Sequence, residues 1–226
     1  MNLQTFSDEQ SWLAASVKFF EDAVNKNPGP IALSGGSTPL PVYEAIAARA
    51  NIQAHGIEVY QADERYVPSA DPRSNQKLIR EHFMLPLQIC CFTPFRTDVP
   101  IEESVKKYEL AIQSGIAPYG GFALTILGIG PDGHTASLFP HSPALHETKR
   151  LTAHTQTDQF AVKDRLTLTF PAILGSKNIL VLLRGKDKQP VIDELRHGTK
   201  TTDEFPAKKL LEREELTICY CQEIKK

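Results

Sequence analysis

The chain has 226 residues, and its shares of hydrophobic (41%) and charged (23%) residues are ordinary for a soluble globular protein. The formal net charge of −2 gives no reason to expect nucleic acid or an anionic membrane as a partner. No apolar run approaches the roughly 20 residues that span a bilayer, and the first residues lack the basic and apolar regions of an export signal. We therefore expect a cytoplasmic protein with a single domain over residues 1–226.

Helical and strand patterns alternate along the chain. Ser7 precedes apolar residues with helical spacing, and Gln10 stands where a capping box places its second member. In the first half the next expected elements are a strand over 31–34, a helix over 39–48, a strand over 57–62, a polar loop, a helix from Ser74 to Phe83 and a strand over 89–95. The second half follows with a helix over 101–115, a strand over 122–128, a polar stretch over 141–159, a strand over 178–185, a helix over 187–197 and a strand over 216–221.

This alternation predicts an α/β fold with an open, mostly parallel sheet and helices on both faces. In such a sheet, ligands bind beyond the carboxyl ends of the strands. Three expected strands run directly into loops rich in glycine or charge, which read "GGSTP", "DER" and "GIGPDGH". We expect these loops to lie side by side and to form a binding site.

The four cysteines occur as two close pairs, Cys90 with Cys91 and Cys219 with Cys221. Neither spacing matches the C-x-x-C pairs of zinc sites or redox motifs. Each pair lies in an apolar run, which favours small buried thiols on strands. We therefore expect reduced, structural cysteines and no metal site.

The stretch "LGIGPDGH", residues 127–134, has the glycine spacing of a dinucleotide-binding turn. Such a turn must lead straight into a helix whose N-terminus faces the pyrophosphate. Pro131 lies inside this turn and Pro140 ends any helix that follows, so the glycines favour a tight loop around Asp132 and His134 instead. His134 could still be an ordinary hydrogen-bonded residue, and Asp132 could orient its ring or make an Asx-type turn.

The stretch "SGGSTP" lies between a strand and a helix. The backbone N–H groups of Gly35, Gly36, Ser37 and Thr38 can therefore face an anion, with help from the hydroxyls and the helix dipole. No Gly-Lys-Ser/Thr follows, so a phosphate monoester fits better than a nucleotide. A simple turn, with Thr38 as cap and Pro39 at the first helical position, explains "TP" but leaves the two glycines unexplained.

Three segments, "ALSGGSTPLPVYEAI", "DERYVPSADPRSN" and "LGIGPDGHTASLFP", closely resemble, in this order, 6-phosphogluconolactonases of the glucosamine-6-phosphate isomerase/6-phosphogluconolactonase superfamily. The similarity continues through "DRLTLTFPAIL" and "NILVLLRGKDKQPVI". The resemblance implies a Rossmann-like sheet and hydrolysis of 6-phospho-D-glucono-1,5-lactone to 6-phospho-D-gluconate, the second step of the pentose phosphate pathway. It also implies a small phosphorylated sugar lactone as partner and no metal or organic cofactor. We expect a monomer or small homo-oligomer.

The residue types suit lactone hydrolysis. One imidazole can take a proton from water and return it to the leaving ring oxygen, so His134 is the expected general base. Asp132 or Asp63 is expected to orient the ring or the substrate hydroxyls. Loop N–H groups, joined by Arg65, are the expected donors to the oxyanion.

By resemblance, Arg165 and Lys188 match basic residues that approach the phosphate in this superfamily. The alternative for each is a solvated surface charge, as it is for the charged loop that begins at Asp63. The sequence departs from the superfamily at His141, where a glycine usually follows "SLFP".

Two other functions are weighed against the lactonase. Glucosamine-6-phosphate deaminases of the superfamily carry an "FNEP"-like segment that supplies a glutamate five residues after the histidine, where this chain has Phe139. They also typically have tyrosine at the position of Arg65. A non-catalytic sugar-phosphate sensor usually carries an appended regulatory segment, and the intact Asp63, Arg65 and His134 favour an enzyme. We expect Phe139 to pack beneath the loop of His134.

Overall fold

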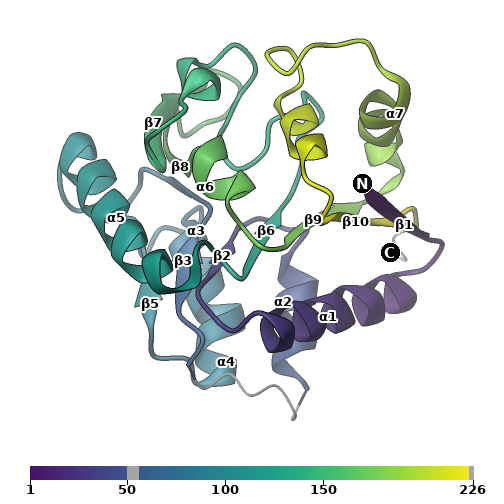
Figure 1. Cartoon of the computed structure of the whole chain (residues 1–226), viewed down its shortest axis with the longest axis horizontal. Coiled ribbons are helices and arrows are strands. Elements are labelled where there is room, and N and C mark those ends of the chain that lie inside the picture. Colours follow the sequence, from purple (N-terminus) through teal and green to yellow (C-terminus); the bar gives the residue numbers. More distant parts are fainter. Residues whose placement is uncertain (50–55, 224–226) are drawn as a thin grey trace.

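A computed structural model of the protein describes residues 1–49 and 56–223 (Figure 1). A sheet of seven strands runs through its centre, and each neighbouring pair of strands is parallel. In spatial order the strands are β1 (Asn2–Phe6), β10 (Leu216–Cys221), β9 (Ile179–Arg184), β6 (Leu124–Leu127), β2 (Ile31–Leu33), β3 (Val59–Gln61) and β5 (Phe92–Thr93). The predicted Rossmann-like α/β fold is confirmed.

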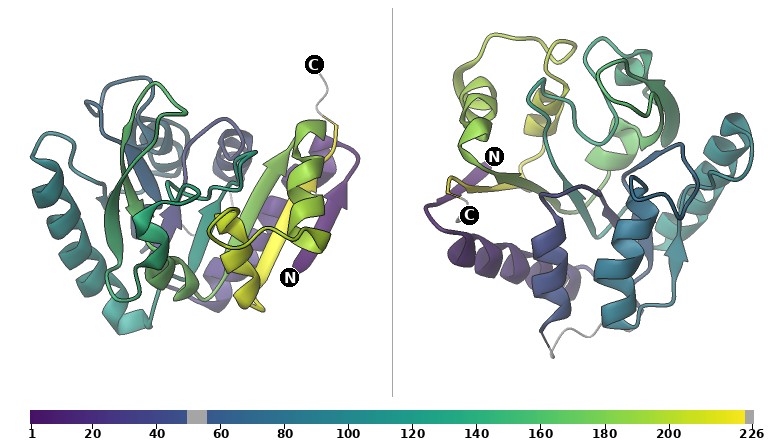
Figure 2. Two further views of the ribbon diagram at one scale, coloured as in Figure 1. Left: turned by 90° about the horizontal axis from the view of Figure 1, so that it is seen from above. Right: turned by 180° about the vertical axis from the view of Figure 1, so that it is seen from behind.

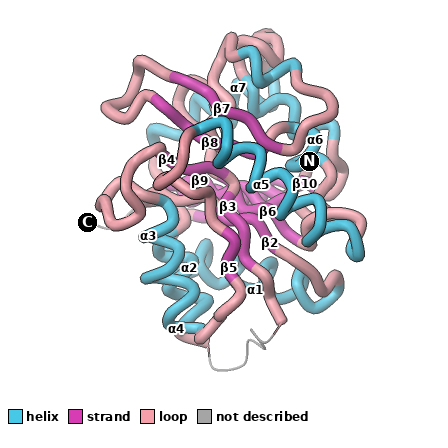
Figure 3. Tube along the Cα trace, turned by 90° about the vertical axis from the view of Figure 1, so that its left-hand side faces the viewer, coloured by secondary structure: helices cyan, strands magenta, loops and turns pink. Residues whose placement is uncertain are grey.

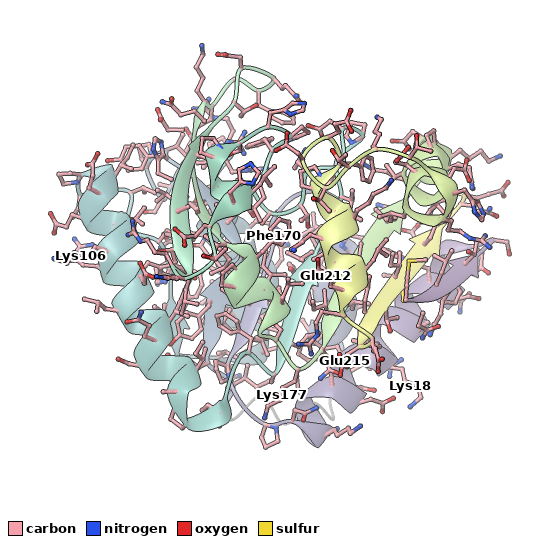
Figure 4. The ribbon with its side chains drawn as sticks, turned by 45° about the horizontal axis from the view of Figure 1, so that its top comes forward. Lys18, Lys106, Phe170, Lys177, Glu212 and Glu215 are labelled. Atoms are coloured by element: carbon pink, nitrogen blue, oxygen red, sulfur yellow. The ribbon has the colours of Figure 1, made fainter. Side chains whose placement is uncertain are left out.

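Helices cover both faces of this sheet (Figures 1 and 2). One face carries α1 (Glu9–Lys26), α2 (Leu40–Ala47), α3 (Asn75–Ile79), the π-helical turn η1 (Arg80–Met84) and α4 (Leu85–Leu87). The other face carries α5 (Ile101–Ile116), α6 (Phe170–Leu174), α7 (Gln189–His197) and the 3₁₀ segments η2 (Ala117–Tyr119), η3 (Pro143–His146), η4 (Lys186–Lys188) and η5 (Pro206–Glu212). Charged side chains such as Lys18 of α1 and Lys106 of α5 point outward (Figure 4).

Alternate residues of the central strands pack against the two helical layers. In β2, Ala32 belongs to the hydrophobic core on the α5 side, while Ile31 and Leu33 belong to the core on the α1 side. Both faces of the strand are therefore buried, which explains why these strands are continuous apolar runs in the sequence.

A second, antiparallel sheet lies on the α5 side of the first (Figure 3). Its strands, in order, are β4 (Asp63–Arg65), β8 (Asp164–Leu168) and β7 (Thr152–Gln156). The sequence predicted a polar loop after residue 62 and a polar stretch over 141–159. Both predictions are wrong in part, because β4 forms in the first segment and β7 in the second. Ala62, which forms a bend, is the single residue between β3 and β4.

The start of the chain also differs from the prediction. Residues 2–6 form β1, which pairs with β10 at one edge of the parallel sheet. The cap of α1 is Asp8, one residue after the predicted Ser7, and its carboxylate accepts a hydrogen bond from the backbone of Ser11 at 2.8 Å. Ser74 caps α3 as predicted, through a 3.3 Å bond from the backbone of Lys77.

The two cysteine pairs have different surroundings. Cys219 and Cys221 are buried in β10, as predicted, and burial raises the pKa of the Cys219 thiol to about 11. Cys90 and Cys91 are exposed, which contradicts the prediction, because the strand that follows them contains only two residues. Each of these cysteines is a free thiol. Among the described residues, no helix has the length and apolar content needed to cross a membrane.

Candidate active site

The three predicted loops meet at the carboxyl ends of the central strands and enclose a cavity of about 290 Å³. The β7–β8 hairpin and η4 complete its wall. The predicted site residues that line it are Gly35, Gly36, Ser37, Thr38, Asp63, Arg65, His134, Arg165 and Lys188. Asp132 does not line the cavity but contacts His134. Two larger cavities of about 500 Å³ border η3, and neither includes a glycine loop or His134.

His134 and Asp132 form an imidazole–carboxylate pair in the loop after β6. The Nδ1 atom of His134 lies 2.5 Å from Oδ1 of Asp132, and the same oxygen accepts the backbone N–H of His134 at 3.2 Å. Asp132 therefore both contacts the ring and makes the Asx-type turn. Burial opposes the charge on Asp132, but the hydrogen bonds and charge of His134 outweigh it and hold the pKa of this carboxyl below its usual range.

The hydrogen bond at Nδ1 selects the tautomer of His134. A ring that donates from Nδ1 keeps a lone pair on Nε2, which is the atom that can accept a proton from water. Gly130 makes room for this arrangement, since a Cβ on it would lie 2.2 Å from the imidazole. Residues 131–138 form turns and isolated bridges and contain no helix, so the glycines do not open a dinucleotide-binding helix.

Asp63 is buried in β4 and both of its carboxylate oxygens accept hydrogen bonds. Asn75 donates to one oxygen at 3.1 Å, and Ser137 donates to the other at 2.7 Å. No hydrogen bond links Asp63 to His134 within the described ranges. Of the two aspartates that could orient the imidazole, Asp132 is therefore the one in contact with it.

Glu64, which the sequence analysis did not single out, organises the loop between β4 and α3. Its fully buried carboxylate accepts bonds of 2.7 Å from the backbone of Arg65, Asn75 and Gln76, and one of 3.0 Å from the hydroxyl of Ser74. Burial raises the pKa of Glu64, and the hydrogen bond from the Gln61 side chain at 2.8 Å opposes the rise together with the three backbone bonds. The interpretation of this segment as a solvated turn is wrong.

Three basic side chains face the cavity. Arg65 and Arg165 stand directly opposite each other in the β4–β8 ladder, and Lys188 donates to the carbonyl of Ile129 at 2.9 Å. Arg165 is only 6% exposed and Lys188 is half-buried, so neither is a solvated surface charge. Burial lowers the pKa of Arg165, while Asp63 opposes this and Arg65 adds to it. Like charges opposite each other in a ladder are destabilising, which favours an anion between them.

The two glycines of "SGGSTP" have different reasons to be glycine. A Cβ on Gly35 would lie 2.1 Å from the amide oxygen of Asn75, so Gly35 leaves room for the side chain that holds Asp63. Gly36 has a φ of +100°, which side chains rarely adopt. The cap of α2 is Pro39 rather than Thr38, and no side chain caps this helix.

Sequence reasoning missed Asn75, Ser137 and Phe160. Asn75 ends the segment "DERYVPSADPRSN", so its neighbourhood was recognised without its role. Phe160 lines the cavity from the hairpin between β7 and β8, and nothing in its polar surroundings in the sequence points to this. Phe139 was predicted correctly: it is 4% exposed and its ring lies 4.9 Å from that of His134.

The fold and the cavity define a Rossmann-like protein in which an imidazole–carboxylate pair stands beside a cluster of cations. The family of glucosamine-6-phosphate isomerases/6-phosphogluconolactonase matches residues 10–219, and the chain belongs to this enzyme family.

Similar proteins are known from distant organisms. The chain is 31% identical to a probable 6-phosphogluconolactonase of Dictyostelium discoideum, over 90% of this chain and 91% of that protein. It is 32% identical to a 6-phosphogluconolactonase of Synechocystis, over 88% of this chain and 85% of that protein. The crystal structure of a 6-phosphogluconolactonase from Thermotoga maritima superposes on this chain with a TM-score of 0.85 and 30% sequence identity. The superposition covers 98% of this chain and 99% of that one. The structure of a monomeric glucosamine-6-phosphate deaminase superposes with a TM-score of 0.86 at 22% identity. The fold alone therefore does not distinguish the two activities.

Proposed function

We propose that the protein hydrolyses 6-phospho-D-glucono-1,5-lactone to 6-phospho-D-gluconate. The observation that carries the proposal is a single cavity that joins the His134–Asp132 pair to Arg65, Arg165 and Lys188. A base next to an anion site suits a lactone that carries a phosphate. The names of the relatives at 30% identity or more support the same substrate. We also propose that it acts in the cytoplasm as a monomer or small homo-oligomer, without a nucleic-acid or membrane partner.

In the proposed mechanism, His134 takes a proton from water while the water oxygen attacks the carbonyl carbon of the lactone. The oxyanion, held by loop N–H groups, collapses and breaks the bond from this carbon to the ring oxygen. The imidazolium returns its proton to that oxygen, which becomes a hydroxyl. Asp132 holds the ring and stabilises the imidazolium. These groups need no metal, so we expect dialysis against a chelator to leave the activity unchanged.

The cations are assigned to the phosphate of the substrate. Arg165 and Lys188 take this role, together with the amides and hydroxyls of residues 35–38. Sequence reasoning expects Arg65 to serve the oxyanion, but its place opposite Arg165 favours the phosphate. A carboxylate has about four acceptor positions, so Asp63 can accept from a substrate hydroxyl besides its two protein donors.

The test is acid release from freshly prepared 6-phosphogluconolactone, measured against the spontaneous rate of ring opening. We expect clear acceleration, and no ammonia from glucosamine 6-phosphate under the same conditions. A deaminase would need a second acid at Phe139, where the structure has a buried ring. The proposal is overturned by a rate equal to the spontaneous one, or by ammonia release comparable to lactone hydrolysis.

A further inference from the structure

Phe160 lies in the hairpin between β7 and β8 and lines the cavity. Its side chain is 41% exposed. In the described part of the chain, the other exposed large hydrophobic residues, Met1, Leu85, Leu110 and Tyr119, do not line this cavity. An aromatic ring left partly exposed beside a base and several cations is typical of a ligand contact.

The ring of Phe160 touches both ends of the site. Its centroid lies 5.7 Å from that of His134, with the two planes 78° apart. The guanidinium carbon of Arg165 lies 5.3 Å from the same centroid, within the range of a cation–π contact. A ligand with its phosphate at Arg165 and its carbonyl at His134 must therefore place the atoms between them near Phe160.

The position of Phe160 is set by hydrogen bonds at the base of its hairpin. The backbone N–H of Thr157 donates to the carbonyl of Lys163 at 3.1 Å and closes the loop. The Nε atom of Arg165 donates to the carbonyl of Val162 at 3.0 Å and ties the loop to the proposed phosphate site. Because these bonds hold the hairpin next to Arg165, the ring of Phe160 is part of the wall of the cavity.

The chemistry of the substrate gives this ring a task. A closed six-membered lactone presents C–H groups on a compact apolar face, whereas the open-chain acid that forms on hydrolysis has no such face. We propose that Phe160 packs against the ring of the lactone and selects closed rings over open-chain sugar acids. This inference rests on the proposed lactonase function and adds a residue that determines specificity.

The experiment compares the wild type with Phe160→Ala and Phe160→Leu. Leu110→Ala changes an exposed apolar residue on α5 that does not line the cavity, and it is the matched control. Three quantities are measured: kcat/KM on 6-phosphogluconolactone, kcat/KM on unphosphorylated gluconolactone, and the inhibition constant of 6-phosphogluconate. The melting temperature of each variant checks that it is folded.

For Phe160→Ala we expect kcat/KM to fall by about three- to tenfold on both lactones, with less than about a twofold change in the inhibition constant of 6-phosphogluconate. For Phe160→Leu the fall in kcat/KM should be smaller, because leucine keeps apolar bulk. The kcat/KM of Leu110→Ala should match that of the wild type. A loss confined to the phosphorylated lactone, or equal weakening of 6-phosphogluconate, overturns the proposal because Phe160 would then act only through Arg165.

The same measurements separate this proposal from the one it rests on. A wild type that does not accelerate lactone opening overturns the lactonase function and the role of Phe160 with it. An active wild type with an equally active Phe160→Ala variant overturns the role of Phe160 alone.

Discussion

The parallel sheet and the small antiparallel sheet contribute different groups to one cavity. The loop after β6 in the parallel sheet supplies His134 and Asp132, and the loop after β2 supplies backbone amides. The antiparallel sheet supplies the charged side chains of Asp63 and Arg65 from β4 and Arg165 from β8. The proposed chemistry thus belongs to the parallel-sheet region. The two arginines proposed to bind the phosphate come from the antiparallel sheet, while Lys188 and residues 35–38 reach the same phosphate site from the parallel sheet.

The two regions also differ in what they bury. The central parallel strands bury apolar side chains, which gain stability simply by leaving water. The antiparallel sheet buries Asp63, Glu64 and Arg165, and each buried charge is costly unless it finds a partner. Several of those partners lie outside the small sheet, so its charged side chains depend on the rest of the molecule for their orientation.

Ser137 links the two regions. It lies in the same loop as His134, and it bonds to all three strands of the small sheet: to Asp63 of β4 through its hydroxyl, to Thr167 of β8 through its N–H, and to Thr155 of β7 through its carbonyl. One short segment therefore connects the loop of His134 to the strands that carry Arg65 and Arg165.

The largest effect is expected in the parallel-sheet half. His134→Ala should lower kcat by about 10²–10⁴-fold, because water then loses its base, while binding of 6-phosphogluconate stays largely intact. Steady-state kinetics and calorimetric binding measure the two effects. His82→Ala, a surface histidine paired with Glu44, is the control and should behave as the wild type. A folded His134→Ala variant that keeps more than about a tenth of the wild-type kcat removes this residue from the mechanism.

In the antiparallel half we expect substitution to weaken substrate binding rather than to lower kcat. Arg165→Ala should raise KM for the phosphorylated lactone by about 10- to 100-fold, the loss of a hydrogen bond to a charged group, with a smaller effect on unphosphorylated gluconolactone. Arg96→Ala, an exposed arginine paired with Asp98, is the control. Equal losses on the two substrates would mean that Arg165 supports the fold or the chemical step, and the division between the two regions would fail.

The same division explains how far sequence reasoning reached. β2, β6, β9 and β10 were predicted because each is an apolar run buried on both faces, and the loops after them follow from the topology. β4 was not predicted, because a strand that buries Asp63 and Glu64 looks like a solvated turn until its partners are known. Those partners include Ser137, which is distant in the sequence, and Asn75, which lies in the recognised segment but shows no pattern that points to its role.

The link between the two regions can be weakened without removing a proposed catalytic group. Ser137→Ala removes one hydrogen bond to Asp63 and keeps the two backbone bonds of residue 137. We expect a loss of about 1–3 kcal/mol in the free energy of unfolding, measured by urea denaturation. Ser104→Ala is the matched control, since in the described structure the buried hydroxyl of Ser104 has no partner and its removal breaks no bond. Equal stabilities of the two variants would show that the contact with Asp63 contributes nothing.

The smallest effect on stability is expected for Asp132→Asn, which tests the imidazole–carboxylate pair. The pKa of Asp132 is lowered in the folded protein, so this carboxylate adds stability above its unfolded pKa of about 3.9, and this stability is lost as the pH falls through the lower folded value. The variant should therefore be less stable than the wild type by about 1 kcal/mol at pH 7, and the difference should shrink as the pH falls below the unfolded pKa of about 3.9. Urea denaturation of both proteins between pH 7 and pH 3 measures this. Because the wild type loses the charge of Asp132 at low pH and the variant never has it, a difference that stays constant across this range would show that the stabilisation does not come from the ionised carboxylate facing His134.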